Sequence, residues 1–481
     1  MICLTLSGGT LANCLEEVKK NRQFIDICEL RLDLISADEQ REAFSFPSLV
    51  DIPVILTLRR VQDGGKFSQS EKARRQLIIE MLEKGNFSYV DIEDDIKRND
   101  IELVAREKGV KIIRSLHDFE GVPEDIFARI KRLRDRGDVA KIAVTPRGIA
   151  DVIKLFRISE ELPDCEKIVI GMGGYGVCTR ILYRKLGSLL TFASDNSVAP
   201  GHIPPSILKN LYKADKVNDA TAVYGIIGNP VLHSSSPFIH NPGFEQIRYN
   251  AIYVPFLVDN VASFFQLAEK IRIRGFSVTI PYKNEVLRYL GNITREVMQI
   301  GACNTVVRVP NMWKGMNTDY YGFLSPIQED IESGRIKSAM VIGAGGAAKS
   351  IVKALRNRDV KVTVINRTLD KAKELAIANL CQYDSLENAK NYENKMDLIV
   401  QTTSVGLDSD ADCNPIEGFK FSGKEIVYDI IYKPKYTKIL KEAERCGCRI
   451  HFGAEMLIEQ GKLQFEAFTG YHYPKNLNPE I

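Results

Sequence analysis

The 481-residue sequence is short of several features that would assign it to a particular class of protein. No apolar run approaches the roughly 18 residues that are needed to span a bilayer. The first residues lack a basic segment followed by a long apolar core, so we expect no export signal and a cytoplasmic protein. The ten cysteines are scattered without any Cys-x-x-Cys pair, and the six histidines are dispersed. This pattern favours reduced thiols and predicts no metal site.

The sequence also lacks an excess of charge of one sign. Lys and Arg number 65 and Asp and Glu number 62, which gives a net charge of +3 and no reason to expect nucleic acid or an anionic membrane as a partner. With 44% hydrophobic and 26% charged residues, the composition is that of a folded protein and excludes disorder and collagen-like repeats. At about 150 residues per domain the length predicts about three units, although one barrel takes up about 200–250 residues alone.

Short apolar runs rich in Ile, Val and Leu recur through the first 210 residues, with amphipathic stretches between them. The runs lie at 2–6, 24–30, 54–58, 89–92, 110–115, 139–144, 167–171 and 189–193. Each is short enough for a buried parallel strand. Eight alternations of strand and helix in this length predict a (β/α)8 TIM barrel. The alternative, a doubly wound open sheet, is disfavoured by the number of units and by the lack of a glycine-rich phosphate loop in this half.

A second α/β region follows the predicted barrel. Residues 211–221 are polar and without a period, which indicates a linker. Beyond them, strands are expected at 222–227, 251–256, 276–280, 339–342, 361–365, 398–401 and 425–430, and a last helix at 454–468. The sequence therefore predicts a barrel over 1–210, then one lobe at 222–325 and a Rossmann-type dinucleotide-binding lobe at 326–481, whose last helix returns to the first lobe.

Lys141 lies inside the apolar run at 139–144. Burial in a strand removes its amine from water and favours the neutral form, and a neutral amine is a nucleophile that forms a Schiff base with a ketone. The alternative is a lysine that extends to solvent from a frayed strand end. His117 follows the preceding strand and is placed for general acid–base chemistry near neutral pH, because adjacent barrel strands bring their ends together.

Other polar residues keep the phase of the strands and follow strand ends, where barrel active sites are built. They are Glu29, Arg31, Asp33, Arg59, Asp91 and Glu93. The alternative is that these residues are scattered surface charges, but surface charges would not recur at the ends of successive strands. Arg31, Arg59 and Arg180 are expected to bind a carboxylate through bidentate hydrogen bonds.

Four of these segments together resemble the type I 3-dehydroquinate dehydratase family over about residues 1–205. They are Glu-Leu-Arg-Leu-Asp at 29–33, Ser-Leu-His-Asp-Phe at 115–119, Lys-Ile-Ala at 141–143 and Ala-Pro-Gly at 199–201. The resemblance implies that Lys141 forms a Schiff base with the substrate ketone. It implies that His117 removes the α-proton and later protonates the departing hydroxyl. The substrate-binding positions implied by the match are Glu29, Arg31, Arg59, Asp63, Glu93, Met172, Arg180 and His202.

Three positions depart from that family's pattern. Asp63 stands four residues after Arg59, where the family usually has Glu. The family loop commonly reads Ser-Ala-Pro-Gly-Gln, whereas this chain has Val198 and His202 at its two ends. Because that loop closes over the substrate in relatives, these changes are expected to alter closure or affinity.

A glycine-rich segment at 341–348 follows a predicted strand and opens a predicted helix. It fits G-x-G-x-x-A, whose small residues let the main chain approach a pyrophosphate at a helix N-terminus. The next strand ends in Asn-Arg-Thr at 366–368, which suits a 2′-phosphate rather than free ribose hydroxyls, so NADP is favoured. The expected cofactor-binding residues are Gly343, Ala344, Gly345, Gly346, Ala347, Asn366, Arg367, Thr368 and Gly453.

Residues 222–470 resemble the shikimate dehydrogenase family. A serine loop at 234–236, Thr279 with Lys283, Gly-Ala-Cys-Asn-Thr at 301–305 and Asn-Thr-Asp at 317–319 precede the glycine-rich loop in family order. The resemblance implies that Lys283 and Asp319 are the catalytic pair, with Lys283 passing a proton to the carbonyl oxygen while NADPH delivers hydride. The implied substrate-binding residues are Ser234, Ser236, Thr279, Asn304, Tyr428 and Gln460.

One chain with both halves resembles the bifunctional dehydratase–dehydrogenases of plants and some bacteria. The resemblance implies conversion of 3-dehydroquinate to 3-dehydroshikimate and then to shikimate, by a monomer or homodimer without a metal. A non-catalytic sensor on the same folds would be expected to lack Lys141, His117, Lys283 and Asp319, which are present. A quinate preference is disfavoured by Ser234 and Ser236. A Schiff-base aldolase is disfavoured by the arginine cluster and the Ala-Pro-Gly loop.

Overall fold

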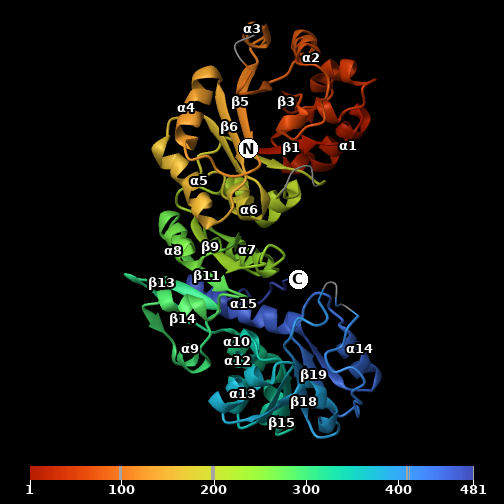
Figure 1. Ribbon diagram of the computed structural model, residues 1–481, viewed down its shortest axis with the longest axis vertical. Coiled ribbons are helices and arrows are strands. Elements are labelled where there is room, and N and C mark those ends of the chain that lie inside the picture. Colours follow the sequence, from red (N-terminus) through yellow and green to blue (C-terminus); the bar gives the residue numbers. More distant parts are fainter. Residues whose placement is uncertain (97–99, 197–200, 408–409, 411, 480–481) are drawn as a thin grey trace. The chain divides into compact units, whose positions relative to one another are not determined.

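The computed structural model describes residues 1–96, 100–196, 201–407, 410 and 412–479 (Figure 1). The chain divides into two compact units, the first made of Met1–Val223 with Asn250–Ile273 and the second of Tyr224–Tyr249 with Arg274–Ile481. The sequence boundary at 221–222 differs from this division, because residues 250–273 associate with the first unit. No helix in the described part of the chain is long and apolar enough to cross a membrane.

The first unit contains an eight-stranded parallel sheet whose hydrogen-bonded order is β7-β6-β5-β4-β3-β2-β1-β8. The strands are β1 (Ile2–Leu6), β2 (Ile27–Arg31), β3 (Val54–Thr57), β4 (Tyr89–Glu93), β5 (Lys111–Asp118), β6 (Val139–Val144), β7 (Lys167–Gly171) and β8 (Thr191–Ala193). A bridge between Lys167 and Ser188 lies at the seam where β7 and β8 approach. The result is the TIM-like barrel that the eight apolar runs predict.

Helices follow the barrel strands and cover them (Figure 1). They are α1 (Leu11–Asn21), α2 (Glu71–Lys84), α3 (Asp100–Glu107), α4 (Ile126–Arg136), α5 (Ile149–Glu161) and α6 (Gly173–Ile181). The hydroxyls of Thr10 and Ser70 accept hydrogen bonds from main-chain N–H groups in the first turns of α1 and α2, which satisfies donors that a helix leaves unpaired. Side chains such as Ile27, Ile113 and Ile168 fill one core of the barrel.

The segment at 211–221 does not extend freely as a linker would. Ala214 and Val217 are buried, and Lys209 forms an ion pair with Asp215 at 2.8 Å. The Arg184 guanidinium donates to the main-chain oxygen of Val217 at 2.6 Å. Polar composition alone predicted a loose connection, because it does not reveal these few apolar side chains and main-chain acceptors that fix the segment.

The remainder of the chain forms two further six-stranded sheets. The first has the order β10-β9-β11-β13-β14-β12, with β9 (Ala222–Gly228), β10 (Ala251–Leu257), β11 (Ile273–Val278), β12 (Asn292–Ile293), β13 (Thr305–Val309) and β14 (Met312–Met316). Its helices are α7 (Ser236–Gln246), α8 (Val261–Lys270), α9 (Arg295–Ile300), α10 (Asp319–Leu324) and α11 (Gln328–Glu332).

The second sheet is parallel and has the order β17-β16-β15-β18-β19-β20, which is the 3-2-1-4-5-6 order of Rossmann folds. Its strands are β15 (Ser338–Ile342), β16 (Lys361–Asn366), β17 (Gln382–Ser385), β18 (Leu398–Gln401), β19 (Ile426–Asp429) and β20 (Arg449–Phe452). The helices are α12 (Gly346–Arg356), α13 (Leu369–Ala378), α14 (Lys438–Arg445) and α15 (Gly453–Thr469). The expected Rossmann-type lobe is therefore present.

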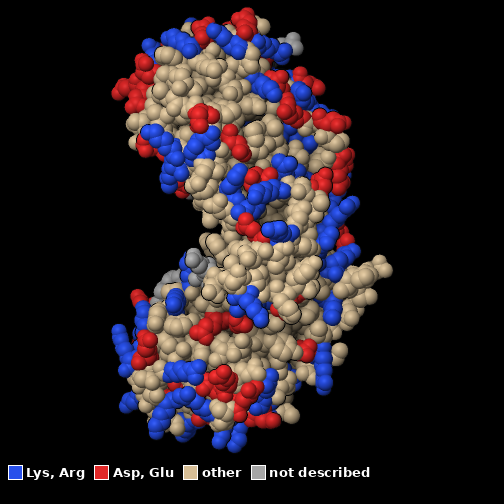
Figure 2. All heavy atoms as spheres, turned by 180° about the vertical axis from the view of Figure 1, so that it is seen from behind, with Lys and Arg blue, Asp and Glu red and all other residues tan. Residues whose placement is uncertain are grey.

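Basic and acidic side chains are interspersed over the face of the molecule drawn in Figure 2. A cluster of buried charged side chains lies inside the barrel, where the ends of neighbouring strands meet.

Candidate functional sites

Lys141 is a buried residue of β6 whose ammonium faces two carboxylates. Its Nζ lies 2.8 Å from Asp91 Oδ2 and 3.6 Å from Glu29 Oε1, and 4.3 Å from the centre of the Phe192 ring. Burial was expected to favour the neutral amine, and the structure adds two carboxylates and an aromatic ring face beside the nitrogen. The structure therefore shows a buried lysine whose nitrogen is held in one position by these neighbours.

His117 lies near the end of β5, the strand next to β6. The register pairs Ser115 with Lys141 and His117 with Ala143, so the side chains of His117 and Lys141 belong to the same end of the barrel. Burial, together with the positive charges of Arg59 and Lys141, lowers the pKa of His117 well below its usual value. Its Nδ1 has no hydrogen-bond partner among the described residues. A neutral imidazole with a free nitrogen is suited to accept a proton.

Arg59 is buried between the carboxylates that β4 supplies. One guanidinium nitrogen lies 2.8 Å from Asp91 Oδ2, and another donates to Glu93 Oε1 at 2.9 Å and to Ser115 Oγ at 3.1 Å. Burial alone would raise the pKa of Asp91, but the adjacent Arg59 and Lys141 more than offset it and hold that pKa far below its usual value. Asp91 is thus the carboxylate that joins the arginine to the lysine. The sequence had placed Asp91 at a strand end without naming it as a site residue.

Arg31 and Asp33 form a bidentate ion pair at 2.9 and 2.7 Å. Asp33 Oδ1 also accepts a hydrogen bond from the Arg59 main-chain N–H at 3.2 Å. Glu29 accepts hydrogen bonds from the hydroxyls of Thr5 and Thr57. These contacts hold the ends of β2 and β3 together around the lysine.

The structure brings three further predicted residues to this end of the barrel. Arg180 is buried, donates to the main-chain oxygen of Phe192 at 3.2 Å, and has its pKa lowered to about 10 by burial. Burial and the charges of Arg180, Arg31 and Lys141 lower the pKa of His202 to about 3. Met172 directly follows β7 and packs in the barrel core.

Two predicted residues have contacts that differ from those expected. Glu93 pairs with Arg59 and also with Arg74, at 2.9 Å each. Both of its oxygens therefore contact arginines and not the space where a substrate was expected. Asp63 pairs with Arg60 at 2.7 Å. Val198 and the Ala-Pro part of the expected loop lie outside the described residues. Gly201 has a φ of +79°, and a Cβ there would meet the Gly173 main-chain oxygen at 2.8 Å.

A second lysine–carboxylate pair lies in the second unit. Lys283 Nζ is 2.6 Å from Asp319 Oδ2, and the other oxygen of Asp319 accepts a hydrogen bond from Asn304 Nδ2 at 2.7 Å. The Asn304 amide also contacts Thr318 Oγ1 at 2.9 Å and Gln460 Oε1 at 3.4 Å. A Cβ on Gly322 would lie 2.6 Å from Gln460 Cβ, so only a glycine lets α10 and α15 approach this closely.

The predicted serine and threonine residues lie at the ends of β9 and β11. Ser234 Oγ donates to Ser236 Oγ at 3.2 Å. The Thr279 N–H donates to the Ile227 oxygen at 2.9 Å, and a Cβ on Gly228 would lie 2.4 Å from Thr279 Cγ2. These contacts place Thr279 beside the start of the serine loop.

Tyr428 does not face this group of residues. It is fully buried in the core, where its ring stacks on Phe323 with centres 5.1 Å apart. Tyr432, four residues later and beyond the end of β19, hydrogen-bonds with the main chain of Ser235. Tyr432 is therefore the tyrosine that reaches the serine loop. The available sequence signal for Tyr432 was its position beyond the end of a strand. The strand was expected to run to 430, and Tyr428 within it was assigned instead.

The glycine-rich segment forms the turn between β15 and α12. Gly343 has a φ of +113°, and a Cβ there would lie 2.5 Å from Thr402 Oγ1. A Cβ on Gly345 would meet no heavy atom within 4 Å, whereas one on Gly346 would lie 3.3 Å from Lys283 Cδ. The loop is thus open at Gly345 and adjoins Lys283, with Ala344 and Ala347 partly exposed beside it.

The end of β16 provides the other part of this candidate cofactor site. Asn366 Nδ2 donates to the Thr368 oxygen at 2.9 Å, and Arg367 and Thr368 are exposed. A Cβ on Gly453 would lie 2.3 Å from the Ile430 oxygen, so α15 begins directly against the loop after β19. An open glycine turn at a helix N-terminus and an exposed arginine fit a dinucleotide with a 2′-phosphate.

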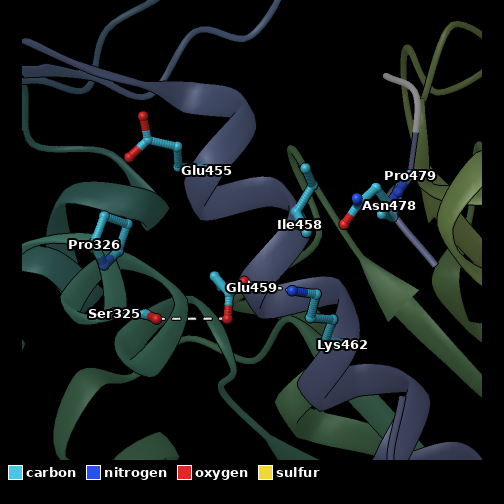
Figure 3. A pocket seen from close by; sticks show the side chains of 8 residues that line it. All are labelled: Ser325, Pro326, Glu455, Ile458, Glu459, Lys462, Asn478 and Pro479. Carbon is cyan, nitrogen blue, oxygen red and sulfur yellow. Dashed lines mark hydrogen bonds and ion pairs between the residues drawn. The ribbon is translucent and has the colours of Figure 1, made fainter. Parts of the chain in front are cut away.

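Two cavities lie apart from these groups. One of about 360 Å³ is lined by Ser325, Pro326, Glu455, Ile458, Glu459, Lys462, Asn478 and Pro479. Figure 3 shows Glu459 between Ser325 and Lys462, with which it interacts at 3.5 and 2.7 Å. The other, of about 500 Å³, adjoins Tyr249, Arg274 and Arg308. Among the described residues, no cluster of His, Cys, Asp and Glu has the geometry to hold a metal ion.

Comparisons with known proteins match both halves of the chain. A family model described as type I 3-dehydroquinase matches residues 2–219. Models described as the shikimate dehydrogenase substrate binding domain and as shikimate/quinate 5-dehydrogenase match residues 226–306 and 327–407.

The chain is 33% identical over 507 residues to the chloroplastic bifunctional 3-dehydroquinate dehydratase/shikimate dehydrogenase of Arabidopsis thaliana, covering 100% of this chain and 84% of the relative. It is 39% identical over 273 residues to the NADP(+) shikimate dehydrogenase of Caldanaerobacter subterraneus subsp. tengcongensis, covering 54% of this chain and 96% of the relative. The crystal structure of shikimate dehydrogenase from Aquifex aeolicus matches with a TM-score of 0.50 and 35% identity, covering 54% of this chain and 96% of that one. A shikimate dehydrogenase solved with NADP+ matches with a TM-score of 0.50 and 33% identity, covering 53% and 92%.

Proposed function

Because the chain belongs to the bifunctional 3-dehydroquinate dehydratase/shikimate dehydrogenase family, we propose that it forms shikimate from 3-dehydroquinate in two steps, with Lys141 as Schiff-base nucleophile and Lys283 with Asp319 as proton-transfer pair. The chain is thus both a lyase and an oxidoreductase. The observation that carries the first step is the position of Lys141 and His117 on adjacent strands. The observation that carries the second is the 2.6 Å contact between Lys283 and Asp319.

In the first step the substrate enters beside Arg31 and Arg180, which bind its carboxylate, while Arg59 stays paired with Asp91 and Glu93. The Lys141 ammonium passes a proton to His117, and the lysine nitrogen attacks the ketone carbon. The imidazolium then returns that proton to the carbinolamine hydroxyl, which leaves as water and gives a protonated imine. His117 removes the adjacent α-proton, and the electron pair moves towards the imine nitrogen. The same imidazolium then returns the proton to the departing hydroxyl, which leaves as a second water. Hydrolysis of the imine consumes one water and releases 3-dehydroshikimate and free Lys141.

In the second step the substrate lies between the serine loop and Asn304. NADPH supplies the hydride when it is bound, with Gly343 to Ala347 against its pyrophosphate and Asn366 to Thr368 against its 2′-phosphate. Lys283 transfers a proton to the carbonyl oxygen, and Asp319, 2.6 Å away, orients the lysine. Ser234, Ser236 and Tyr432 hold the end of the substrate away from the reacting carbon.

The test combines activity with covalent trapping. Purified protein is incubated with 3-dehydroquinate, with and without NADPH, and shikimate is expected only with NADPH. Borohydride added with 3-dehydroquinate is expected to reduce the imine to a stable adduct, found on the Lys141 peptide by mass spectrometry. The control variant Lys167→Met removes another buried barrel lysine and is expected to keep the adduct. Absence of an adduct from an active wild-type protein would overturn the Schiff-base proposal.

Three finer points complete the proposal. We expect shikimate to be preferred over quinate, which a steady-state comparison of the two substrates tests. Cytoplasmic location is tested by cell fractionation. A monomer or homodimer is tested by light scattering of the purified chain.

A further inference from the structure

Arg74 is a fully buried cation that the chemistry above does not use. It lies on α2 (Glu71–Lys84), and its side chain contacts one main-chain oxygen and two carboxylates. Building on the proposed function, we propose that Arg74 is a positioning residue of the dehydratase site. It acts by fixing Arg59 and, through Arg59, the charge environment of Lys141.

The first line of support is an unbroken series of ion pairs. Arg74 Nη1 lies 2.9 Å from Glu93 Oε2, whose other oxygen accepts a hydrogen bond from Arg59 at 2.9 Å. Arg59 lies 2.8 Å from Asp91 Oδ2, and the same oxygen lies 2.8 Å from Lys141 Nζ. The charges therefore alternate from helix α2 to the reactive nitrogen. All five side chains are at least 95% buried, so the protein interior screens these interactions weakly.

The second line of support is a main-chain contact. Arg74 Nη1 also donates to the Leu58 oxygen at 2.9 Å, and Leu58 directly precedes Arg59. Arg74 thus holds Arg59 from two sides, through the backbone before it and through Glu93 beside it. The bidentate pair with Glu71, at 2.8 and 3.1 Å, fixes the guanidinium against its own helix.

Loss of Arg74 has a defined consequence for the site. Glu93 would keep only Arg59 as a partner and draw it away from Asp91. Asp91 would then retain Ser115 and Lys141 as partners and, together with Glu29, would hold the lysine as its ammonium more strongly. The nucleophilic amine would become rarer, whereas the substrate carboxylate would still meet Arg31 and Arg180. The expected result is a lower kcat with little change in KM, and an acid limb of the rate profile displaced to higher pH.

The experiment compares three substitutions in the full-length chain. Arg74→Met removes both the charge and the hydrogen bonds, and we expect dehydratase kcat to fall about 100-fold, the size expected when catalytic groups shift by about 1 Å. Arg74→Lys keeps the charge and is expected to recover part of that loss. Glu71→Gln loosens only the helix side and is expected to cost about threefold, because one charged partner is exchanged for a neutral one.

The matched control is Lys167→Met. Lys167 is a buried cation of the same barrel that donates to the main-chain oxygens of Leu162 and Cys165, at the start of β7 rather than its end. We expect the dehydratase kcat of this variant to stay within about twofold of wild type. Shikimate dehydrogenase activity of each preparation measures the amount of active chain, and circular dichroism checks that the barrel is folded.

Three results decide the proposal. A large fall in kcat at unchanged KM, with a displaced acid limb and partial recovery in Arg74→Lys, supports it. A KM effect alone, or equal losses in Arg74→Met and Lys167→Met, overturns it. If Arg74→Met does not fold, Arg74→Lys decides: wild-type kcat and an undisplaced pH profile would overturn the proposal. Borohydride trapping of the wild type is scored separately, so failure of the Schiff base and failure of the Arg74 role are distinguishable.

Discussion

The two proposed active sites contain the same pair of side chains, a lysine and an aspartate, in contrasting surroundings. In the barrel, Lys141 and Asp91 lie 2.8 Å apart within a buried network of arginines and carboxylates. In the dehydrogenase half, Lys283 and Asp319 lie 2.6 Å apart beside the neutral amides and hydroxyls of Asn304, Thr318 and Gln460. A network of charges can alter whether a lysine holds its proton. Neutral groups hold a pair in place and leave proton transfer between lysine and carbonyl to the pair itself.

The largest expected effect comes from replacing each of the two lysines in turn, because each substitution is expected to remove one activity and leave the other. Lys141→Met removes the nucleophile, so dehydratase activity is expected to fall by at least about 10⁴-fold, with dehydrogenase activity unchanged. Lys283→Met is expected to lower dehydrogenase kcat by about 10²–10⁴-fold, the range for loss of a general acid, and to leave dehydration unchanged. Both rates are measured on the same preparation. Loss of both activities in either variant would contradict independent sites.

The next effect concerns two buried aspartates whose pKa values move in opposite directions. Burial raises the pKa of Asp429 from 3.8 to about 6, although Thr437 and the Ile431 N–H donate to it. The folded protein then keeps a proton that the unfolded chain has released, so stability is lost as pH rises from about 4 to 6. This difference corresponds to about 3 kcal/mol. Asp91 has a lowered pKa, so its contribution is present above about pH 4 and is lost below it.

We therefore expect Asp429→Asn to be more stable than wild type above pH 6, by up to about 3 kcal/mol, and equal to it near pH 4. The measurement is denaturant unfolding followed by fluorescence of Trp313, the single tryptophan of the chain, which lies on β14. A pH-independent difference between the two proteins would exclude titration of Asp429 as the cause.

A smaller effect tests the neutral surroundings of the second lysine. Asn304→Leu removes the amide that donates to Asp319 at 2.7 Å, and a hydrogen bond to a charged group contributes about 1.5–3 kcal/mol. Dehydrogenase kcat/KM is expected to fall about 10–100-fold. The control is Asn357→Leu, which removes a side-chain contact with Tyr320 and is expected to have little effect. Equal effects in the two variants would assign Asn304 a purely structural role.

The smallest effect distinguishes the two tyrosines. Tyr432→Phe removes a hydroxyl beside the serine loop and is expected to raise the dehydrogenase KM up to about tenfold, the size of one hydrogen bond. Tyr428→Phe alters a phenol packed between Phe323 and His451 and is expected to leave KM within about twofold. A larger increase in KM for Tyr428→Phe than for Tyr432→Phe would support the sequence-based assignment of Tyr428.

Sequence patterns predicted the strands that are buried on both faces. The runs at 2–6, 139–144 and 167–171 coincide with β1, β6 and β7, because a continuous apolar run is the signature of such a strand. The strands β12, β13, β14, β17 and β20 were missed. β17 is a polar edge strand of sequence Gln-Tyr-Asp-Ser, and β13 and β14 form a hairpin with Asn311 at positive φ. Their stability comes from neighbours that are distant in sequence.

The site residues also divide into features that the sequence predicted and features that it did not. The spacing of His117 and Lys141 followed from strand periodicity, and their placement at one end of the barrel needed only the parallel topology. The contact between Lys141 and Asp91 did not follow, because burial arguments treat one residue at a time. Arg74 lies in the polar stretch Glu-Lys-Ala-Arg-Arg-Gln at 71–76, where nothing distinguishes it from its exposed neighbours. Only the contacts of the Arg74 side chain with the Leu58 main-chain oxygen and with Glu93 of β4 reveal its partners.

The charged side chains of the barrel have a further consequence for the order of events. The cations Arg31, Arg59, Arg74, Lys141 and Arg180 equal in number the carboxylates Glu29, Asp33, Glu71, Asp91 and Glu93. A substrate with a single carboxylate adds one negative charge to this balanced set. Its dehydration product carries the same single carboxylate, so charge balance distinguishes the empty enzyme from the occupied one but not substrate from product. Release of the product must then depend on hydrolysis of the covalent bond to Lys141 rather than on a change of charge.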